Sequence, residues 1–366
     1  MYFSGVSYNN PIMKALFIGG TGTISTAISK RVLEKGWELY LLNRGNRNRE
    51  LEAAGKAGKL IEIACDIRTE DEAAISGKIK KALADSGTKA FDVVADFIAF
   101  TPAHVEKDFK IFSALCKQYF FISSASAYQK PLSSYLITES TPLANPLWQY
   151  SRDKIACEDF LMQKYRECGF PVTIVRPSHT YDERSVPLGV HGANGSWQVI
   201  KRMLEGKPVI IHGDGTSLWT MTHNSDFARA FTGLMGNIHA IGEAVQITSD
   251  ESLSWNQIYQ AIANALNVEL KAVHVSSEFL DEFSGGRYDF RGGLMGDKSN
   301  SVVFDNTKLK RMVPSFHARL RFDEGVKLCV AHILKHPELQ REDPEFDAWC
   351  DKVIAAREKA LKDCNH

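Results

Sequence analysis

The sequence predicts an α/β protein with a doubly wound parallel sheet, followed by a smaller C-terminal lobe. Two observations carry this prediction. In the first half of the chain, short apolar runs alternate with longer amphipathic stretches, a pattern typical of a parallel sheet covered by helices on both faces. After Pro177 the apolar runs shorten while Gly, His and Trp become frequent, which indicates a second lobe.

The expected elements follow one another along the chain. The first apolar run, KALFIG (14–19), is a buried strand, and the stretch after it over Thr23–Lys35 is a helix. Further strands are expected at 37–43, 59–65, 91–97, 119–124 and 171–177. Helices are expected between them over Glu70–Ser86, Ala103–Lys117 and Trp148–Arg166. The second lobe is expected to hold strands at 208–213 and 243–248 and helices over Trp197–Leu204 and Trp255–Leu266.

These elements divide the chain into four parts. We expect an N-terminal tail over 1–12, without the pattern of a signal peptide, and a nucleotide-binding domain over 13–178. The second lobe, which mainly binds substrate, is expected over 179–336. The charged amphipathic end, 337–366, is expected to be a helical surface tail.

Composition excludes several classes of partner. The 366 residues carry 44 basic and 44 acidic side chains, so no overall field favours a nucleic acid or an anionic membrane. No apolar run is long enough to cross a bilayer. The seven cysteines are scattered and lack the spacing of a metal site or a disulfide framework. We therefore expect a cytoplasmic protein without a metal centre, whose partner is a small molecule.

Glycines cluster between the first strand and the first helix. A turn of this composition lets the backbone and the helix amino end approach a pyrophosphate, as in Rossmann-type dinucleotide-binding folds. Ser25 stands where the third glycine of the usual fingerprint would be. A tight turn without a ligand is the alternative interpretation. The residues expected to contact the cofactor here are Gly19, Gly20, Thr21, Gly22, Thr23 and Ile24.

The residues after the second strand bear on the choice between NAD and NADP. An acidic side chain at this position would bind the ribose hydroxyls of NAD, but the chain has Asn43 and Arg44. An arginine can hold a 2′-phosphate or stack on adenine, which favours NADP over NAD, while an exposed basic loop is the alternative. Asp66 and Ile67, after the third strand, are expected at the adenine.

The residues that can carry chemistry follow the fifth strand. Tyr150 and Lys154 are four residues apart on an expected helix and therefore share one face. An ammonium near a phenol lowers the phenol pKa, which would make Tyr150 an acid/base near neutral pH. Ser124, at the end of the strand, could bond the same substrate oxygen. The Tyr-x-x-x-Lys spacing is not specific alone, so its position after the fifth strand decides the interpretation.

With these motifs the chain resembles the extended branch of the short-chain dehydrogenases/reductases, the NAD-dependent epimerases and dehydratases, over about residues 14–335. The resemblance lies in GGTGTIS, YSRDK, RPSHTY and GDGTSLWTMTHNSDFA. It implies that Tyr150 is the acid/base, that Lys154 binds the cofactor ribose and tunes Tyr150, and that Ser124 orients the substrate. It also implies that Pro177 and Ser178 lie near the nicotinamide. A homodimer through the helices over Ala103–Lys117 and Trp148–Arg166 is implied as well.

Two departures from the family bear on the substrate. Trp219 and Leu294 stand where nucleotide-sugar enzymes commonly carry diphosphate-binding arginines, which favours a sugar or glycoside without a diphosphate. Substitution of these arginines by Arg184, Arg287 and Arg291 is the alternative. Tryptophans suit stacking on a sugar face, although buried ones are more often part of the core. The candidate substrate contacts are Ser126, His179, Arg184, Trp197 and Trp219.

The expected function is NAD(P)-dependent oxidation or epimerisation at a hydroxyl-bearing carbon of a sugar, nucleotide sugar or glycoside. The alternatives are an NADPH-dependent carbonyl reductase and a non-catalytic nucleotide- or RNA-binding protein of the same fold. Neutral charge and the set Ser124, Tyr150 and Lys154 argue against the binding protein.

Overall fold

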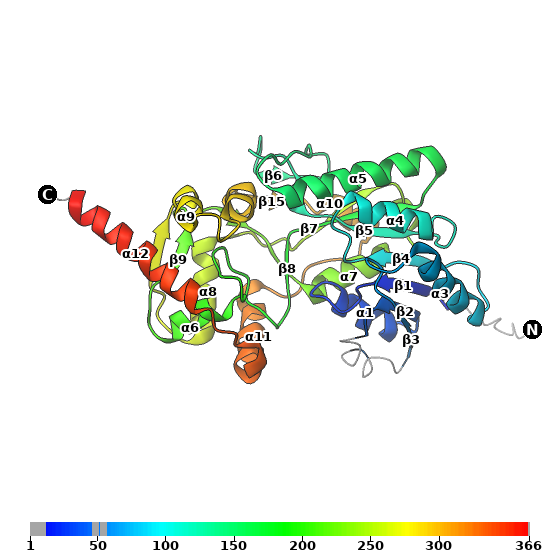
Figure 1. Ribbon diagram of the computed structural model, residues 1–366, viewed down its shortest axis with the longest axis horizontal. Coiled ribbons are helices and arrows are strands. Elements are labelled where there is room, and N and C mark those ends of the chain that lie inside the picture. The colour runs from blue at the N-terminus through cyan, green and yellow to red at the C-terminus, as the bar shows by residue number, and fades with distance from the viewer. Residues whose placement is uncertain (1–11, 46–50, 52–56, 365–366) are drawn as a thin grey trace, which may run out of the picture.

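A computed structural model describes residues 12–45, 51 and 57–364, and in it the chain forms two bodies side by side (Figure 1). The tail expected over 1–12 lies outside the described residues except for Ile12. In the described part of the chain, no helix is both long enough and apolar enough to cross a membrane.

The first body contains a seven-stranded parallel sheet, which confirms the predicted fold class. Its strands run in the order β12-β7-β5-β4-β1-β2-β3, so the order reverses between β1 and β4. Ligands bind at such a reversal, outside the carboxyl ends of the strands. The strands are β1 (Lys14–Ile18), β2 (Glu38–Asn43), β3 (Lys59–Ala64), β4 (Val93–Asp96), β5 (Tyr119–Ile122), β7 (Val172–Pro177) and β12 (Ala244–Ile247).

Helices cover both faces of this sheet because the strands are apolar on both sides. On one face, α1 (Ser25–Glu34), α7 (Asn224–Leu234) and α10 (Thr307–Met312) share a buried apolar cluster with the strands. On the other face lie α3 (Glu72–Asp85), α4 (Pro102–Phe112) and α5 (Gln149–Cys168). The predicted helices of this body are therefore present, with ends shifted by a few residues.

The second body has its own apolar core, around the side chains of Trp255, Tyr259 and Trp349. It contains helices α6 (Trp197–Leu204), α8 (Trp255–Leu266), α9 (Ser277–Ser284), α11 (Phe322–Lys335) and α12 (Pro344–Cys364). The parallel pair β9 (Val209–His212) and β14 (Ala272–Val275) completes it.

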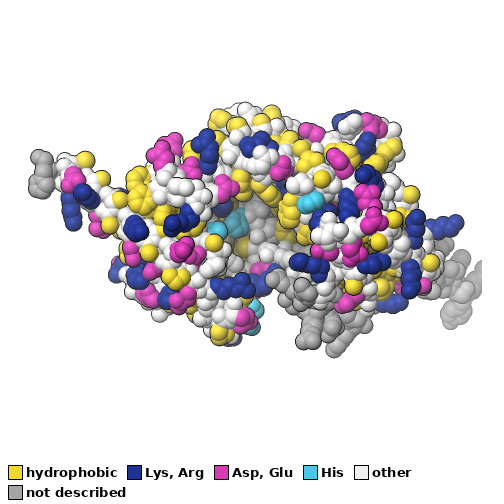
Figure 2. All heavy atoms as spheres, viewed as in Figure 1, with side chains coloured by type: hydrophobic (Ala, Val, Ile, Leu, Met, Phe, Trp, Pro, Cys, Tyr) yellow, Lys and Arg dark blue, Asp and Glu magenta, His cyan; other side chains and the backbone are white. Residues whose placement is uncertain are grey.

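Short elements fill the region between the bodies. These are β8 (His179–Tyr181) with β11 (Met221–His223), β6 (Leu136–Ile137) with β15 (Val303–Phe304), and β10 (Leu218–Trp219) with β13 (Leu253–Ser254). The 3-10 turn η1 (Ala125–Ala127) precedes β6, and the π-helical turn η3 (Arg291–Lys298) precedes β15. Two further 3-10 turns lie elsewhere: η2 (Ile238–Ala240) between α7 and β12, and η4 (Pro337–Leu339) between α11 and α12. Figure 2 shows that the surface is hollowed between the two bodies.

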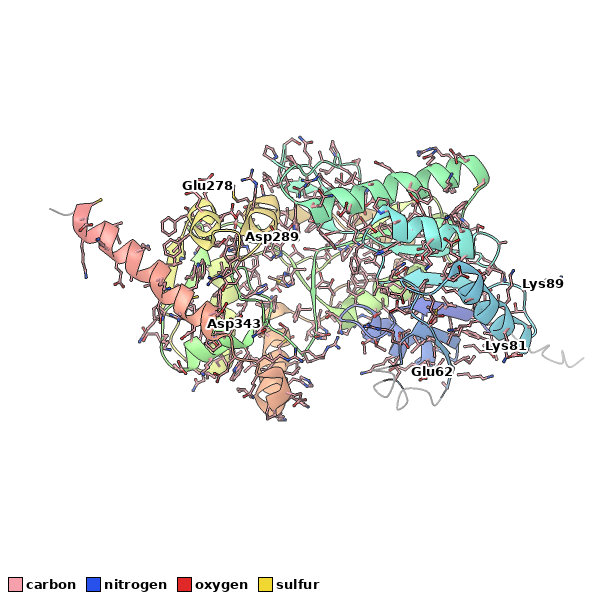
Figure 3. The ribbon with its side chains drawn as sticks, viewed as in Figure 1. Glu62, Lys81, Lys89, Glu278, Asp289 and Asp343 are labelled. Atoms are coloured by element: carbon pink, nitrogen blue, oxygen red, sulfur yellow. The ribbon has the colours of Figure 1, made fainter. Side chains whose placement is uncertain are left out.

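Two expected boundaries differ from the structure. The strand expected in the second lobe at 243–248 pairs with β7 and completes the main sheet, and α7 packs on that sheet as well. The chain therefore returns to the first body after residue 178. The C-terminal end is not only a surface tail, because Phe346, Trp349 and Val353 of α12 are buried in the second core. Asp343, labelled in Figure 3, accepts a hydrogen bond from the amide of Phe346 (3.1 Å) where α12 begins.

Candidate active site

The turn after β1 brings backbone close to its neighbours. Gly19 has a φ of +76°, a conformation that favours glycine, and a Cβ on Gly20 would lie 2.4 Å from Cδ2 of Leu41. The hydroxyl of Ser25 donates to the carbonyl of Gly19 (2.7 Å) and accepts from the amide of Gly22 (2.8 Å). Ser25, which replaces the third glycine, therefore holds the turn together.

The amino end of α1 is suited to an anion. Its N-cap residue, Ile24, makes no capping hydrogen bond through its side chain. The amide of Thr26 in the first turn donates to the carbonyl of Gly22 (3.0 Å), and the helix dipole favours a negative charge at this end. A pyrophosphate carries negative charge and oxygen atoms that accept hydrogen bonds from backbone amides, so it suits this helix end.

A cavity of about 680 Å³ joins the glycine turn to the ends of β2 and β3. Seven of the residues predicted to bind the cofactor line it: Gly19, Thr21, Gly22, Asn43, Arg44, Asp66 and Ile67. Gly20, Thr23 and Ile24 are not part of its lining, and Gly20 instead packs against Leu41. The residues that sequence reasoning missed here include Arg68, Phe100 and His104.

The two arginines of this cavity differ in their surroundings. Arg68 pairs with the buried carboxylates of Asp96 (2.5 Å) and Asp108 (3.5 Å), which neutralise its charge. Arg44 is exposed at the edge of the cavity. Because Asn43 precedes it where NAD enzymes carry an acid, a 2′-phosphate would meet Arg44 and no carboxylate at the end of β2.

Lys154 is fixed beneath the carboxyl edge of the sheet. Its ammonium donates to the carbonyls of Ala99 (2.6 Å) and Ile122 (2.7 Å). It lies 4.8 Å from the ring centroid of Phe100, which lines the large cavity, and 5.6 Å from that of Tyr150. Lys154 is thus located between the cofactor cavity and Tyr150.

One electrostatic expectation is wrong. Burial raises the pKa of Tyr150 to about 12, an effect that the hydrogen bond with Ser124 opposes, and Lys154 does not lower it. Burial also lowers the pKa of Lys154 to about 8. The spacing of Tyr150 and Lys154 indicated that they share a helix face, but burial has a larger effect on the pKa of each group than the charge of the other.

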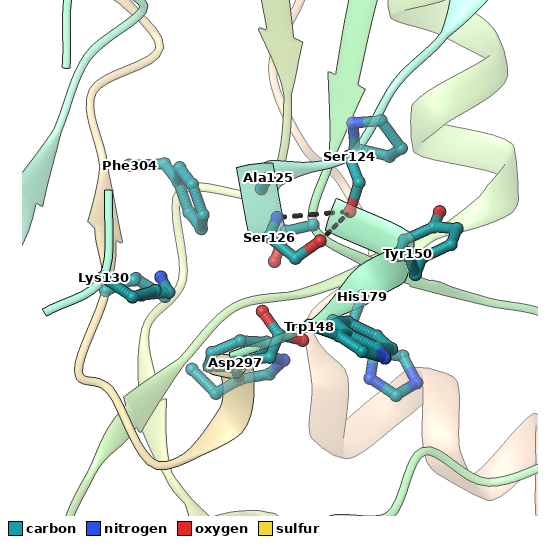
Figure 4. A pocket seen from close by; sticks show the side chains of 13 residues that line it. Ser124, Ala125, Ser126, Lys130, Trp148, Tyr150, His179, Asp297 and Phe304 are labelled. Atoms are coloured by element: carbon teal, nitrogen blue, oxygen red, sulfur yellow. Dashed lines mark hydrogen bonds between the residues drawn. The ribbon is translucent and has the colours of Figure 1, made fainter. Parts of the chain in front are cut away.

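A smaller pocket of about 260 Å³ lies beside Tyr150 (Figure 4). Its lining includes the predicted residues Ser124, Ser126, Tyr150, Pro177, Ser178, His179 and Trp219. The hydroxyls of Ser124 and Ser126 are 2.8 Å apart, and Ser151 donates to Ser126 (2.7 Å). The pocket therefore has a chain of hydroxyls next to the phenol of Tyr150.

Two predicted substrate contacts do not line this pocket. Arg184 is bound to the carboxylate of Asp182, two residues earlier, through its backbone amide (3.0 Å) and its side-chain Nε (2.9 Å). Trp197 packs against the apolar core of the second body. His179 does line the pocket, and burial lowers its pKa to about 3, so it is neutral at physiological pH.

Sequence reasoning also missed six residues that line this pocket: Ala125, Lys130, Trp148, Asp297, Val302 and Phe304. Asp297 follows Gly296 in the GGLMGD segment. In this segment only Leu294 was singled out from the sequence, because it stands where related enzymes carry an arginine. No local pattern marks Lys130, because its role depends on what the fold brings near it.

The reversal of strand order, the glycine turn and the Tyr150–Lys154 pair at the same sheet edge define a dinucleotide-dependent α/β enzyme. The chain belongs to the NAD dependent epimerase/dehydratase family, whose sequence model matches residues 15–247. The match covers more than half of the chain and confirms the resemblance to the extended short-chain dehydrogenases/reductases.

Curated relatives are distant. The 2′-dehydrokanamycin reductase of Streptomyces kanamyceticus is 27% identical over 198 residues, covering 54% of this chain and 54% of that protein. The chloroplast stem-loop binding protein of 41 kDa b of Arabidopsis thaliana is 26% identical over 289 residues, covering 76% of this chain and 70% of that protein. The chain thus spans only about half the length of the reductase it matches.

Solved structures of the family share the fold. Epimerase Mth375 from Methanothermobacter thermautotrophicus has a TM-score of 0.70 and 15% identity, covering 90% of this chain and 94% of that one. The UDP-glucuronic acid 4-epimerase from Bacillus cereus, in complex with UDP-glucuronic acid and NAD, has a TM-score of 0.68 and 18% identity, covering 88% of this chain and 99% of that one. At such identities the likeness shows the fold alone.

Proposed function

We propose that this protein transfers a hydride between a nicotinamide dinucleotide and a hydroxyl-bearing carbon of a sugar, nucleotide sugar or glycoside. The observation that carries the proposal is the position of Lys154 between two cavities. One holds the glycine turn, and the other holds Ser124 and Tyr150. A cofactor in the first and a substrate in the second would meet beside Tyr150.

The residues divide the chemistry as follows. When bound, the nicotinamide accepts or returns the hydride. As the C–H electrons leave the substrate carbon, the hydroxyl proton passes to Tyr150 and a carbonyl forms. Ser124 hydrogen-bonds the same oxygen, and Ser126 and Ser151 orient the Ser124 hydroxyl. In an epimerase the hydride would return to the other face of the carbonyl. In a dehydrogenase the carbonyl product would leave, and the reduced cofactor would have to be exchanged.

The glycine turn and the ends of β2 and β3 are the proposed cofactor site. The turn would hold the pyrophosphate, and Asp66 and Ile67 would contact adenine. Arg44 favours NADP, while the NAD in the Bacillus cereus epimerase complex keeps NAD as the alternative. Pro177 and Ser178 would lie beside the nicotinamide.

One observation favours a second candidate, an NADPH-dependent carbonyl reductase. With its pKa raised to about 12, Tyr150 holds a proton at neutral pH and can donate it to a ketone oxygen. Taking a proton from an alcohol requires the phenolate, which is scarce at that pH. The name of the kanamycin-related reductase is consistent with this direction of reaction.

We also propose a homodimer through α4 and α5. These helices contact one another and bear partly exposed apolar side chains, among them Phe109, Phe160 and Tyr165. Sedimentation at micromolar concentration tests this proposal, and a monomer would contradict it.

Native mass spectrometry of the purified protein tests the function. The proposal expects a bound nicotinamide dinucleotide. Tight retention would favour an epimerase, and rapid exchange would favour a dehydrogenase or reductase. No affinity for either dinucleotide would contradict the proposal and favour the nucleic-acid-binding alternative, which the plastid relative represents.

A further inference from the structure

Lys130 places an unpaired ammonium at the wall of the small pocket. The residue is 4% exposed and lines the pocket opposite Tyr150. Its backbone amide donates to Ala144 (2.7 Å), but among the described residues its ammonium makes no hydrogen bond or ion pair. Burial lowers its pKa, and the negative charge of Asp297 opposes this effect. Its ammonium therefore has hydrogen-bond donors left for an acceptor on a ligand.

Asp297 supplies a carboxylate to the same pocket, and packing holds it there. The segment that carries it docks on the residues before α5: the side chain of Asn145 donates to the carbonyl of Gly296 (2.8 Å). A Cβ on Gly292 would lie 2.0 Å from Cδ1 of Trp148, so this contact requires glycine. The π-helical turn that holds Asp297 is therefore fixed in position over the pocket.

The two charges face one space without meeting. Figure 4 shows the ammonium of Lys130 and the carboxylate of Asp297 directed into the pocket, and in the described structure they form no ion pair with each other. A hydroxyl between them can accept from the ammonium and donate to the carboxylate at once. The indole N–H of Trp219, also buried and without a partner, is a second donor at this pocket.

The charge balance of the pocket distinguishes between substrates. Among the lining residues, Lys130 and Asp297 carry opposite charges, and His179 is neutral because its pKa is about 3. Lys298, which follows Asp297 in the chain, does not line the pocket, but its positive charge also acts on Asp297. A neutral, hydroxyl-bearing ring satisfies both charged groups. A ring that bears its own carboxylate would be attracted to Lys130 but would also place a second negative charge beside Asp297, whose pKa burial already raises.

We infer that Lys130 and Asp297 are substrate-binding residues that bridge a hydroxyl of one neutral sugar ring and disfavour rings bearing a carboxylate. The inference rests on the proposed function, since it assigns the ring that would react at Tyr150. It applies to the ring in the pocket and holds whether or not that ring carries a nucleotide.

Two probe pairs that differ only in the ring test this inference: methyl α-D-glucoside against methyl α-D-glucuronide, and UDP-glucose against UDP-glucuronic acid. Binding to the protein with its dinucleotide is measured by calorimetry, and turnover by cofactor reduction. We expect the wild type to favour the neutral member of a pair by about tenfold.

The variants should move this preference in opposite directions. Asp297→Asn leaves the pocket with a net positive charge, so the preference should shift toward the uronate. Lys130→Met removes the positive charge from the lining and leaves Asp297 there, so the uronate should be rejected more strongly while the neutral ring also binds about tenfold more weakly. The exposed Lys271→Met is the matched control and should change nothing.

Several results would overturn the inference. A wild type that prefers the uronate, equal effects of both variants on both members of a pair, or no binding of any of the four probes would each do so. Cofactor affinity, measured on the same samples, separates these failures from failure of the proposed function. If the dinucleotide binds and only the ring preference is absent, the proposed function is retained, but the proposed substrate-binding role of Lys130 and Asp297 is wrong.

Discussion

Gly20 and Gly22 allow the stability of the glycine turn to be separated from its ligand binding. A Cβ on Gly20 would lie 2.4 Å from Leu41 Cδ2 and 3.1 Å from Ser29 Oγ, inside the packed core. A Cβ on Gly22 would meet only Oγ of Ser25, at 3.3 Å, and Gly22 lines the large cavity. Gly20→Ala should therefore disturb the fold, whereas Gly22→Val should fill the proposed pyrophosphate site.

Gly20→Ala should change the free energy of unfolding, whereas Gly22→Val should change the dissociation constant for the dinucleotide. Overpacking of a core costs about 1–3 kcal/mol, so Gly20→Ala should lower the free energy of unfolding by that amount. The valine of Gly22→Val would displace one charge-assisted hydrogen bond to the pyrophosphate, worth about 1.5–3 kcal/mol. Because 1.4 kcal/mol is tenfold in affinity, the Kd for the dinucleotide should rise about 10–100-fold. The free energy of unfolding of Gly22→Val should stay close to that of the wild type.

Urea unfolding and titration of NADH or NADPH fluorescence measure the two quantities separately. If Gly22→Val is folded and binds the dinucleotide as tightly as the wild type, the cofactor site is misplaced. A Gly20→Ala protein as stable as the wild type would contradict the close packing against Leu41 instead.

Three further variants test other parts of the site. Lys154→Met removes a buried ammonium whose pKa is about 8 in the folded protein and 10.5 in the unfolded chain. Between pH 8 and 10.5 the unfolded chain binds more protons, so the stability of the wild type relative to the variant should rise by up to about 3 kcal/mol over this range. Urea unfolding across pH measures this difference, and no change would contradict the burial effect. The facing rings of Phe100 and Phe121 favour the ammonium and make this value an upper limit. Arg44→Ala should weaken NADP more than NAD in parallel titrations, and an equal loss would mean that Arg44 serves only adenine. Ser124→Ala should lower kcat less than Tyr150→Phe does, because the Tyr150 hydroxyl still meets the substrate oxygen; an equal or larger loss in steady-state turnover would show that Ser124 has a larger role.

The sequence was sufficient for the architecture of the first body because its signals are local. Strand and helix periods, and the glycine turn after β1, can be read from consecutive residues. Membership of β12 in the main sheet could not be read, since it depends on pairing with β7 after the chain has passed through the second body. The apolar positions of α12 that enter the second core were likewise hidden within a charged stretch.

The candidate site divides in the same way. The common face of Tyr150 and Lys154 follows from their spacing, but the raised pKa of Tyr150 follows from burial, which spacing does not report. Lys130 and Asp297 are far apart in the sequence, and only the fold brings both of them to the lining of one pocket. The pairing of Arg184 with Asp182 could have been predicted from the sequence, because Asp182 lies only two residues before it.

The central claim is that Tyr150 exchanges a proton with a substrate oxygen while hydride moves to or from a nicotinamide. The most direct measurement is single-turnover cofactor reduction or oxidation, by wild type and by Tyr150→Phe, with the sugar or ketosugar that the wild type turns over best. The ring packing of the variant is retained, so its cofactor affinity should match the wild type while its rate falls by about 10²–10⁴. A Tyr150→Phe protein with an unchanged rate would contradict the claim.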